Sequence, residues 1–147
     1  AQQRIWSRMT LLGFDYGRRR IGVSVGNRLT GTARELTVID NNDTPDWEGI
    51  AKLIQDWQPE ALVIGLPLDA SGHEQDITRD SRKFASQLEQ RHKLRVHMMD
   101  ERYTSVEAES QLKAQRQAGV RKRLRKGDSD RAAARLILEN WLQLNSS

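Results

Sequence analysis

Three short segments rich in apolar and β-branched residues occupy the first forty positions. Residues 10–15 and 20–26 form the first two, joined by a turn at 16–19, and residues 32–39 form the third. Such segments separated by short, glycine-containing links are typical of strands in an antiparallel meander. The polar run at 41–43 that follows predicts a loop.

Beyond residue 45, apolar positions follow either helical spacing or short continuous runs. Helical spacing predicts helices over about 47–57, 75–91, 105–117 and 129–144. Thr44 or Asp46 is placed to cap the first of these helices, and Thr104 or Ser105 the third. The continuous runs at 61–66 and 94–99 are typical of strands buried on both faces.

Taken together, these elements predict an α/β fold. Five strands and four helices follow one another in the order β-β-β-α-β-α-β-α-α, which favours a mixed sheet with helices on both faces. The chain has 147 residues, a length that suits one domain with a substantial core. We expect residues 9–147 to form that domain and residues 1–8 to be an N-terminal extension ahead of an original start at Met9.

Composition narrows the class of protein. Hydrophobic residues make up 37% and charged residues 30% of the chain, as in globular proteins rather than disordered ones. The sequence has no cysteine, which excludes disulfides and thiolate metal sites and fits a reducing cytoplasm. No apolar run approaches the roughly 20 residues of a membrane span, so we expect no membrane partner.

Positive charge is concentrated in two places. Residues 113–126 carry seven basic groups and no acid, and residues 1–28 carry six arginines against a single acid, Asp15. The rest of the chain is net acidic, although the whole carries a formal charge of +4. Two basic islands on an acidic chain indicate a polyanionic partner, and a solvated charge run is the alternative. We expect residues 118–127 to be mobile without nucleic acid and to become ordered on binding it.

The candidate chemistry lies in carboxylates that follow or begin predicted elements. Asp15 ends the first strand, Glu101 follows the fifth, and Asp130 begins the last helix. Carboxyl ends of parallel strands gather at one sheet edge, where such sheets bind ligands, so these three acids are expected to converge. Alternation along a strand prevents Asp100 and Glu101 from both facing the site. Asp128 and Asp130 are also suited to capping the helix, which leaves Asp128 as the alternative third ligand.

Three carboxylates without histidine or cysteine favour a hard cation, Mg²⁺ or Mn²⁺. Two such ions about 3.5–4 Å apart can hold the attacking and leaving oxygens of a phosphodiester, so the sequence predicts one or two ions. Basic side chains near these acids and in the second island would hold flanking phosphates. They are Arg18, Arg19, Arg20, Arg102, Arg121, Lys122, Arg123, Arg125 and Lys126.

Four motifs in order resemble one family. They are Leu12-Gly13-Phe14-Asp15-Tyr16-Gly17 with Ile21-Gly22-Val23-Ser24-Val25-Gly26, Val63-Ile64-Gly65-Leu66-Pro67-Leu68, Asp100-Glu101-Arg102-Tyr103-Thr104-Ser105, and Asp130 with Ala132-Ala133 and Ile137-Leu138. Together they resemble the YqgF (RuvX) family of bacterial ribonuclease H-like proteins. Its members are described both as Holliday junction resolvase homologues and as pre-16S rRNA nucleases.

The resemblance implies a ribonuclease H-like three-layer α/β/α fold, with a five-stranded mixed sheet whose second strand is antiparallel. It also implies that Asp15, Glu101 and Asp130 bind metal and catalyse. The expected function is a metal-dependent nuclease that acts on structured RNA, in 5′-end processing of pre-16S rRNA during ribosome biogenesis. The alternatives are a resolvase-like endonuclease acting on branched DNA and a non-catalytic RNA-binding assembly factor. Compared with the resolvases, no carboxylate ends the fourth strand, and the oligomeric state stays open between a monomer and a weak homodimer.

Overall fold

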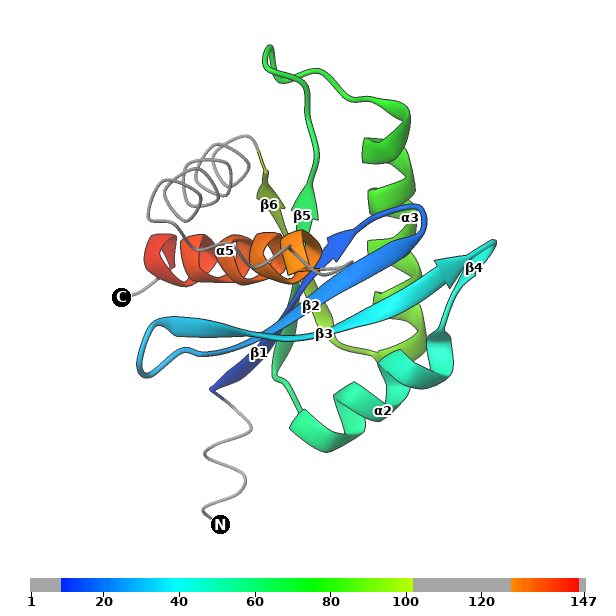
Figure 1. Ribbon diagram of the computed structural model, residues 1–147. Coiled ribbons are helices and arrows are strands. Elements are labelled where there is room, and N and C mark those ends of the chain that lie inside the picture. The colour runs from blue at the N-terminus through cyan, green and yellow to red at the C-terminus, as the bar shows by residue number, and fades with distance from the viewer. Residues whose placement is uncertain (1–8, 102–127, 146–147) are drawn as a thin grey trace, which may run out of the picture.

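A computed structural model describes residues 9–101 and 128–145, with side chains in the second range described from Asp130 onward. These residues form a twisted mixed sheet between helices on its two faces (Figure 1). The helix expected at 105–117, the basic stretch 118–127 and the extension 1–8 lie outside the described residues.

The sheet is built around β1. Its strands are β1 (Thr10–Tyr16), β2 (Arg20–Asn27), β3 (Thr32–Asn42), β4 (Thr44–Pro45), β5 (Ala61–Leu66) and β6 (Arg95–Asp100), in the spatial order β4-β3-β2-β1-β5-β6. β2 pairs antiparallel with both β1 and β3, while β5 pairs parallel with β1 and β6. The predicted meander of three strands followed by parallel strands is therefore confirmed.

The five predicted strands are the five long ones, and β4 adds a two-residue strand at the edge. The loop expected at 41–43 is wrong in part, because Asn41 and Asn42 belong to β3. Asn41 is buried, and its side-chain amide donates to the carbonyl of Gly17 at 2.7 Å. A tertiary contact with the β1–β2 turn thus outweighs the turn preference of asparagine and extends the strand.

The helices are α2 (Trp47–Trp57), α3 (Asp76–His92) and α5 (Asp128–Leu144). Of the two residues predicted to cap α2, Asp46 does so: its carboxylate accepts from the amide of Gly49 at 3.1 Å. Gln75 and Thr78 form a capping box at the start of α3. No helix among the described residues is long and apolar enough to cross a membrane.

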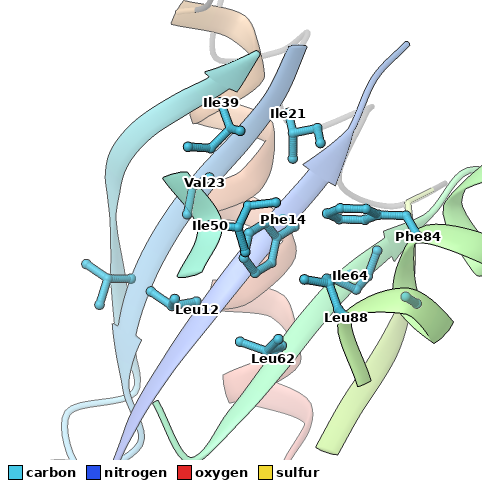
Figure 2. Close-up of a cluster of buried hydrophobic side chains, with 12 residues drawn as sticks. Leu12, Phe14, Ile21, Val23, Ile39, Ile50, Leu62, Ile64, Phe84 and Leu88 are labelled. Carbon is cyan, nitrogen blue, oxygen red and sulfur yellow. The ribbon is translucent and has the colours of Figure 1, made fainter. Parts of the chain in front are cut away.

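Two hydrophobic clusters hold the layers together. On one face, α2 and α3 bury Ile50, Phe84 and Leu88 against the sheet (Figure 2). The strands contribute side chains at alternate positions to this cluster, labelled in the figure as Leu12, Phe14, Ile21, Val23, Ile39, Leu62 and Ile64. On the other face, α5 is the helix that packs among the described residues, and Ile137 and Leu138 are fully buried there. The three-layer α/β/α arrangement expected for the chain is present.

Candidate active site

Asp15 lies near the carboxyl end of β1, on the face that α5 covers. Alternation along the strand places it on the same side as Leu11 and Gly13, both of which face α5, whereas Leu12 and Phe14 belong to the opposite cluster. The carboxyl group is therefore mounted on a central strand, paired on both sides, where the backbone is held rigidly.

Glu101 reaches the same face from β6. Its backbone amide donates to the carbonyl of Leu66 at 3.0 Å, which continues the pairing of β5 and β6 by one residue. Because Met99 belongs to the cluster under α5, alternation turns Glu101 toward α5 and Asp100 to the other side. The side chain of Glu101 lies over Gly65, where a Cβ would stand 2.7 Å from the carboxyl carbon. A larger residue at position 65 would displace this acid.

Asp15 and Glu101 are joined by a hydrogen bond between their side chains. Burial raises the pKa of Asp15 well above its ordinary value, and the bond to Glu101 and the negative charges of Glu101 and Asp130 raise it further. Burial also raises the pKa of Glu101, with a further contribution from Asp100, while the bond to Asp15 opposes the rise. Without a cation, the hydrogen bond and the raised pKa of each group favour a proton between the two carboxyls.

Asp130 completes the group of acids from the first turn of α5. Its backbone carbonyl lies directly over Gly22, the residue paired with Asp15 across β1 and β2. Its carboxylate accepts a hydrogen bond from Nε of Arg20 at 3.0 Å, in an ion pair that is about one quarter to one third exposed. Asp130 is thus close enough to raise the pKa of Asp15, yet its carboxylate is engaged by an arginine.

A stripe of small residues on β2 brings α5 this close. Gly22, Ser24 and Gly26 alternate along the face toward α5, and the hydroxyl of Ser24 donates to the carbonyl of Ala134 at 2.7 Å. A Cβ on Gly26 would stand 2.8 Å from a methyl carbon of Leu138. We did not identify Ser24 as a positioning residue from the sequence, although the period-two pattern of small residues was a usable signal for close helix packing.

The donor set suits a divalent cation. Asp15 and Glu101 present hard carboxylate oxygens side by side, and a cation would relieve the repulsion between their charges. Within the described ranges, no three acidic or histidine side chains are already arranged around one metal position. One oxygen of the Asp130 carboxylate is occupied by Arg20, while Asp15 and Glu101 lie together.

Three of the predicted phosphate-binding residues belong to the described part of the chain. Arg18 forms an exposed ion pair with Asp80 at 3.3 Å, and Arg20 holds Asp130 as described, so both lie at the edge that carries the acids. Arg19 is exposed in the same turn. Six further basic residues and the side chain of Asp128 lie outside the described residues, and their roles stay predictions. The six are Arg102, Arg121, Lys122, Arg123, Arg125 and Lys126.

A family model and two relatives each match this chain over most of its length. A family model described as RuvX: Holliday junction resolvase matches residues 9–144. A protein of Edwardsiella ictaluri named "Putative pre-16S rRNA nuclease" is 44% identical over 135 residues, covering 91% of this chain and 94% of its own. A protein of Escherichia coli O7:K1 with the same name is 46% identical over 135 residues, covering 91% and 96%.

The fold also has solved counterparts. The structure of Thermus thermophilus RuvC superimposes with a TM-score of 0.54 at 15% identity and covers 94% of this chain and 98% of that one. The same protein in complex with a Holliday junction substrate gives 0.52 at 16% identity, covering 95% and 98%. The likeness establishes that the described layers form a ribonuclease H-like fold.

Proposed function

Since the chain belongs to the RuvX family, we propose that it is a metal-dependent nuclease that hydrolyses phosphodiester bonds in the 5′-end processing of pre-16S rRNA during ribosome biogenesis. One observation carries this proposal: the hydrogen-bonded pair Asp15 and Glu101, with Asp130 beside it, at the carboxyl edge of the parallel strands. RNA is the favoured substrate because relatives at 44–46% identity are named for it.

Asp15, Glu101 and Asp130 would hold the cation, Mg²⁺ or Mn²⁺, as one or two ions. When bound, such ions supply Lewis-acid activation of water and stabilisation of the leaving oxygen. Asp15 and Glu101 must first release the proton they share. Arg20, once separated from Asp130, is positioned to pair with a phosphate oxygen of the substrate. The arginine thereby exchanges one anion for another and is not left unpaired.

Resolution of branched DNA is the second candidate, favoured by the description of the family. It needs two active sites held apart in a symmetric dimer for paired nicks. No carboxylate ends β5, where Leu66 precedes Pro67, and the space over Gly65 is filled by the side chain of Glu101. The third candidate, a non-catalytic assembly factor, would bind RNA without hydrolysing it.

A cleavage assay separates these functions. A pre-16S rRNA fragment, a four-way DNA junction and a linear duplex are each incubated with the protein and Mg²⁺ or Mn²⁺. We expect cleavage of the rRNA fragment by the wild type and by Asp56→Asn, which removes an exposed acid on α2, and none by Asp15→Asn. Equal cleavage by Asp15→Asn would show that the carboxylate site is wrong. Preferential cleavage of the junction would favour the resolvase, and binding without cleavage under either metal the assembly factor.

A further inference from the structure

A second polar site lies at the other end of the strands from the acids. It is a cavity of about 410 Å³ between the end of β2, the starts of β5 and β6, and the last turns of α5. Its volume is within the range of small-ligand sites. Its polar and aromatic lining consists of Arg28, Glu60, Arg95, His97, Trp141 and Asn145.

The cavity is held in shape by contacts around Trp141. The His97 ring lies with its centroid 4.7 Å from that of Trp141, and the guanidinium of Arg28 lies 5.8 Å above the same indole. Arg28 also pairs with Glu60 at 2.5 Å. The half-exposed guanidinium of Arg28 is therefore fixed in direction by an aromatic ring and a carboxylate.

The cavity lining carries more positive than negative charge, with two arginines and one glutamate. Arg95 is exposed and has no ion pair within the described part of the chain. Glu60, the acid in the lining, is already paired with Arg28. Burial lowers the pKa of His97, and the charges of Arg95 and Arg28 lower it further. Cationic groups that crowd one another in this way are stabilised by an anion placed among them.

We propose that this cavity binds a backbone phosphate of the nucleic acid strand whose cleavage takes place at the acids, and so acts as a second anchor for the substrate. The inference rests on the proposed function for the identity of the strand. Arg95 and Arg28 supply guanidinium donors to the phosphate oxygens, and the ring of His97 supplies a further donor.

The spacing of the two sites suits one strand. Ala61 and Leu66 mark the two ends of β5, about 17 Å apart at ~3.3 Å per residue. Along α5, Asp130 and Trp141 are separated by about 17 Å at ~1.5 Å per residue. Both elements therefore place the anchor about five stacked nucleotides from the acids, at ~3.4 Å per step.

The test is the salt dependence of binding to a single-stranded RNA of about ten nucleotides, long enough for the span. It is measured without divalent metal, so that no cleavage occurs. Arg95→Gln removes the exposed guanidinium. Lys83→Gln is the matched control, because it removes the same charge from an exposed position on α3, on the other face of the sheet. We expect Arg95→Gln to reduce the slope of log affinity against log salt by about 0.7, and Lys83→Gln to leave it unchanged.

A double variant examines Arg28 without leaving a buried charge unpaired. Arg28→Gln with Glu60→Gln keeps the net charge of the protein, so weaker binding would report a lost contact and not a change in overall charge. We expect a severalfold loss of affinity for the RNA. Inorganic phosphate is titrated in parallel, and tight binding of it in preference to the RNA would overturn the strand anchor in favour of a site for a free anion.

The outcomes distinguish this inference from the proposed function. If Arg95→Gln and Lys83→Gln give the same slope as the wild type, the anchor is wrong, and the nuclease is still judged by its cleavage assay. If the slope falls for Arg95→Gln alone while no substrate is cleaved under either metal, the anchor stands and catalysis does not. If the wild type binds no RNA, both proposals fail.

Discussion

The hydrogen-bonded pair Asp15 and Glu101 links the stability of this protein to pH. Folding raises the pKa of Asp15 from its ordinary value of 3.8, so the folded state binds that proton more tightly than the unfolded state does. The resulting stabilisation is fully present below the unfolded pKa and is lost as the pH rises through the folded pKa. Without metal, the pair becomes a source of instability as the pH rises and it loses its proton.

Asp15→Asn should therefore stabilise the metal-free protein at neutral pH. We expect a gain of about 1 kcal/mol, or about 3 °C in the unfolding midpoint, and a loss of the stabilisation that Mg²⁺ gives the wild type. Thermal unfolding at several pH values, with and without Mg²⁺, measures both effects, and the gain of the variant should shrink toward acid pH. Asp56→Asn is the control, because that acid is exposed on α2. A destabilised Asp15→Asn would contradict the proposed instability of the pair.

Arg20 is the second residue whose role can be separated by experiment. In the proposed site, its ion pair with Asp130 would compete with the cation for the same carboxylate. We expect Arg20→Gln to bind Mg²⁺ severalfold more tightly in the absence of nucleic acid, since a partly exposed pair contributes at most about 1 kcal/mol. The same variant should bind RNA more weakly.

Calorimetric titration with Mg²⁺ and a separate RNA-binding measurement give the two values. Arg79→Gln is the matched control, because Arg79 pairs with the exposed Asp76 on α3, on the other face of the sheet. Unchanged affinities of Arg20→Gln for Mg²⁺ and for RNA would show that Arg20 neither restrains Asp130 nor meets a phosphate.

Among the elements, α5 sets the position of Asp130 relative to Asp15. The helix approaches the sheet over small residues, and the backbone carbonyl of Asp130 occupies the place where a side chain on Gly22 would project. Nothing but glycine fits there without moving the helix. At Gly26, in contrast, the neighbouring atoms are methyl groups of Leu138 and Leu142 that can adjust.

Gly22→Ala should therefore impair the site more than Gly26→Ala. We expect both to destabilise the fold by about 1–3 kcal/mol, as overpacking does. Only Gly22→Ala should also weaken Mg²⁺ binding by tenfold or more, because it displaces the turn that carries Asp130. Unfolding and Mg²⁺ titration are measured for both variants below their unfolding midpoints. Equal Mg²⁺ affinities would mean that the position of Asp130 is unimportant for the cation.

How far the sequence predicted these features differs from residue to residue. The strand at 61–66 is predicted to the residue, because a continuous apolar run is typical of a strand buried on both faces of a sheet. The convergence of Asp15 and Glu101 followed from the parallel order of the strands. The pairing of Arg20 with Asp130 was not predicted, because 110 positions separate them and only the packing of α5 on β2 brings them together.

Across the whole molecule, the two faces of the sheet contribute differently to stability and to the geometry of the candidate site. The cluster under α2 and α3 contains contacts between aromatic rings. The ring centroid of Phe84 lies 5.9 Å from that of Phe14 and 5.7 Å from that of Trp47. The cluster under α5 also supports the acids, because Ile137 and Glu101 both lie against Gly65. One face therefore contributes mainly stability, and the other couples stability to the geometry of the site.

A pair of equal substitutions tests this division. Ile137→Val removes the terminal methyl group that lies beside Glu101 over Gly65, and Ile64→Val removes the same group from the neighbouring residue of β5 on the opposite face. Both side chains are fully buried, so each change should lower the free energy of unfolding by about 0.5–1.5 kcal/mol. Only Ile137→Val should also reduce Mg²⁺ affinity and the rate of RNA cleavage, because the cavity it leaves lets Glu101 move away from Asp15. The measurements are unfolding by denaturant, Mg²⁺ titration and cleavage for both variants, and an equal loss of Mg²⁺ affinity in the two would show that the acids depend on overall stability and not on the face that α5 covers.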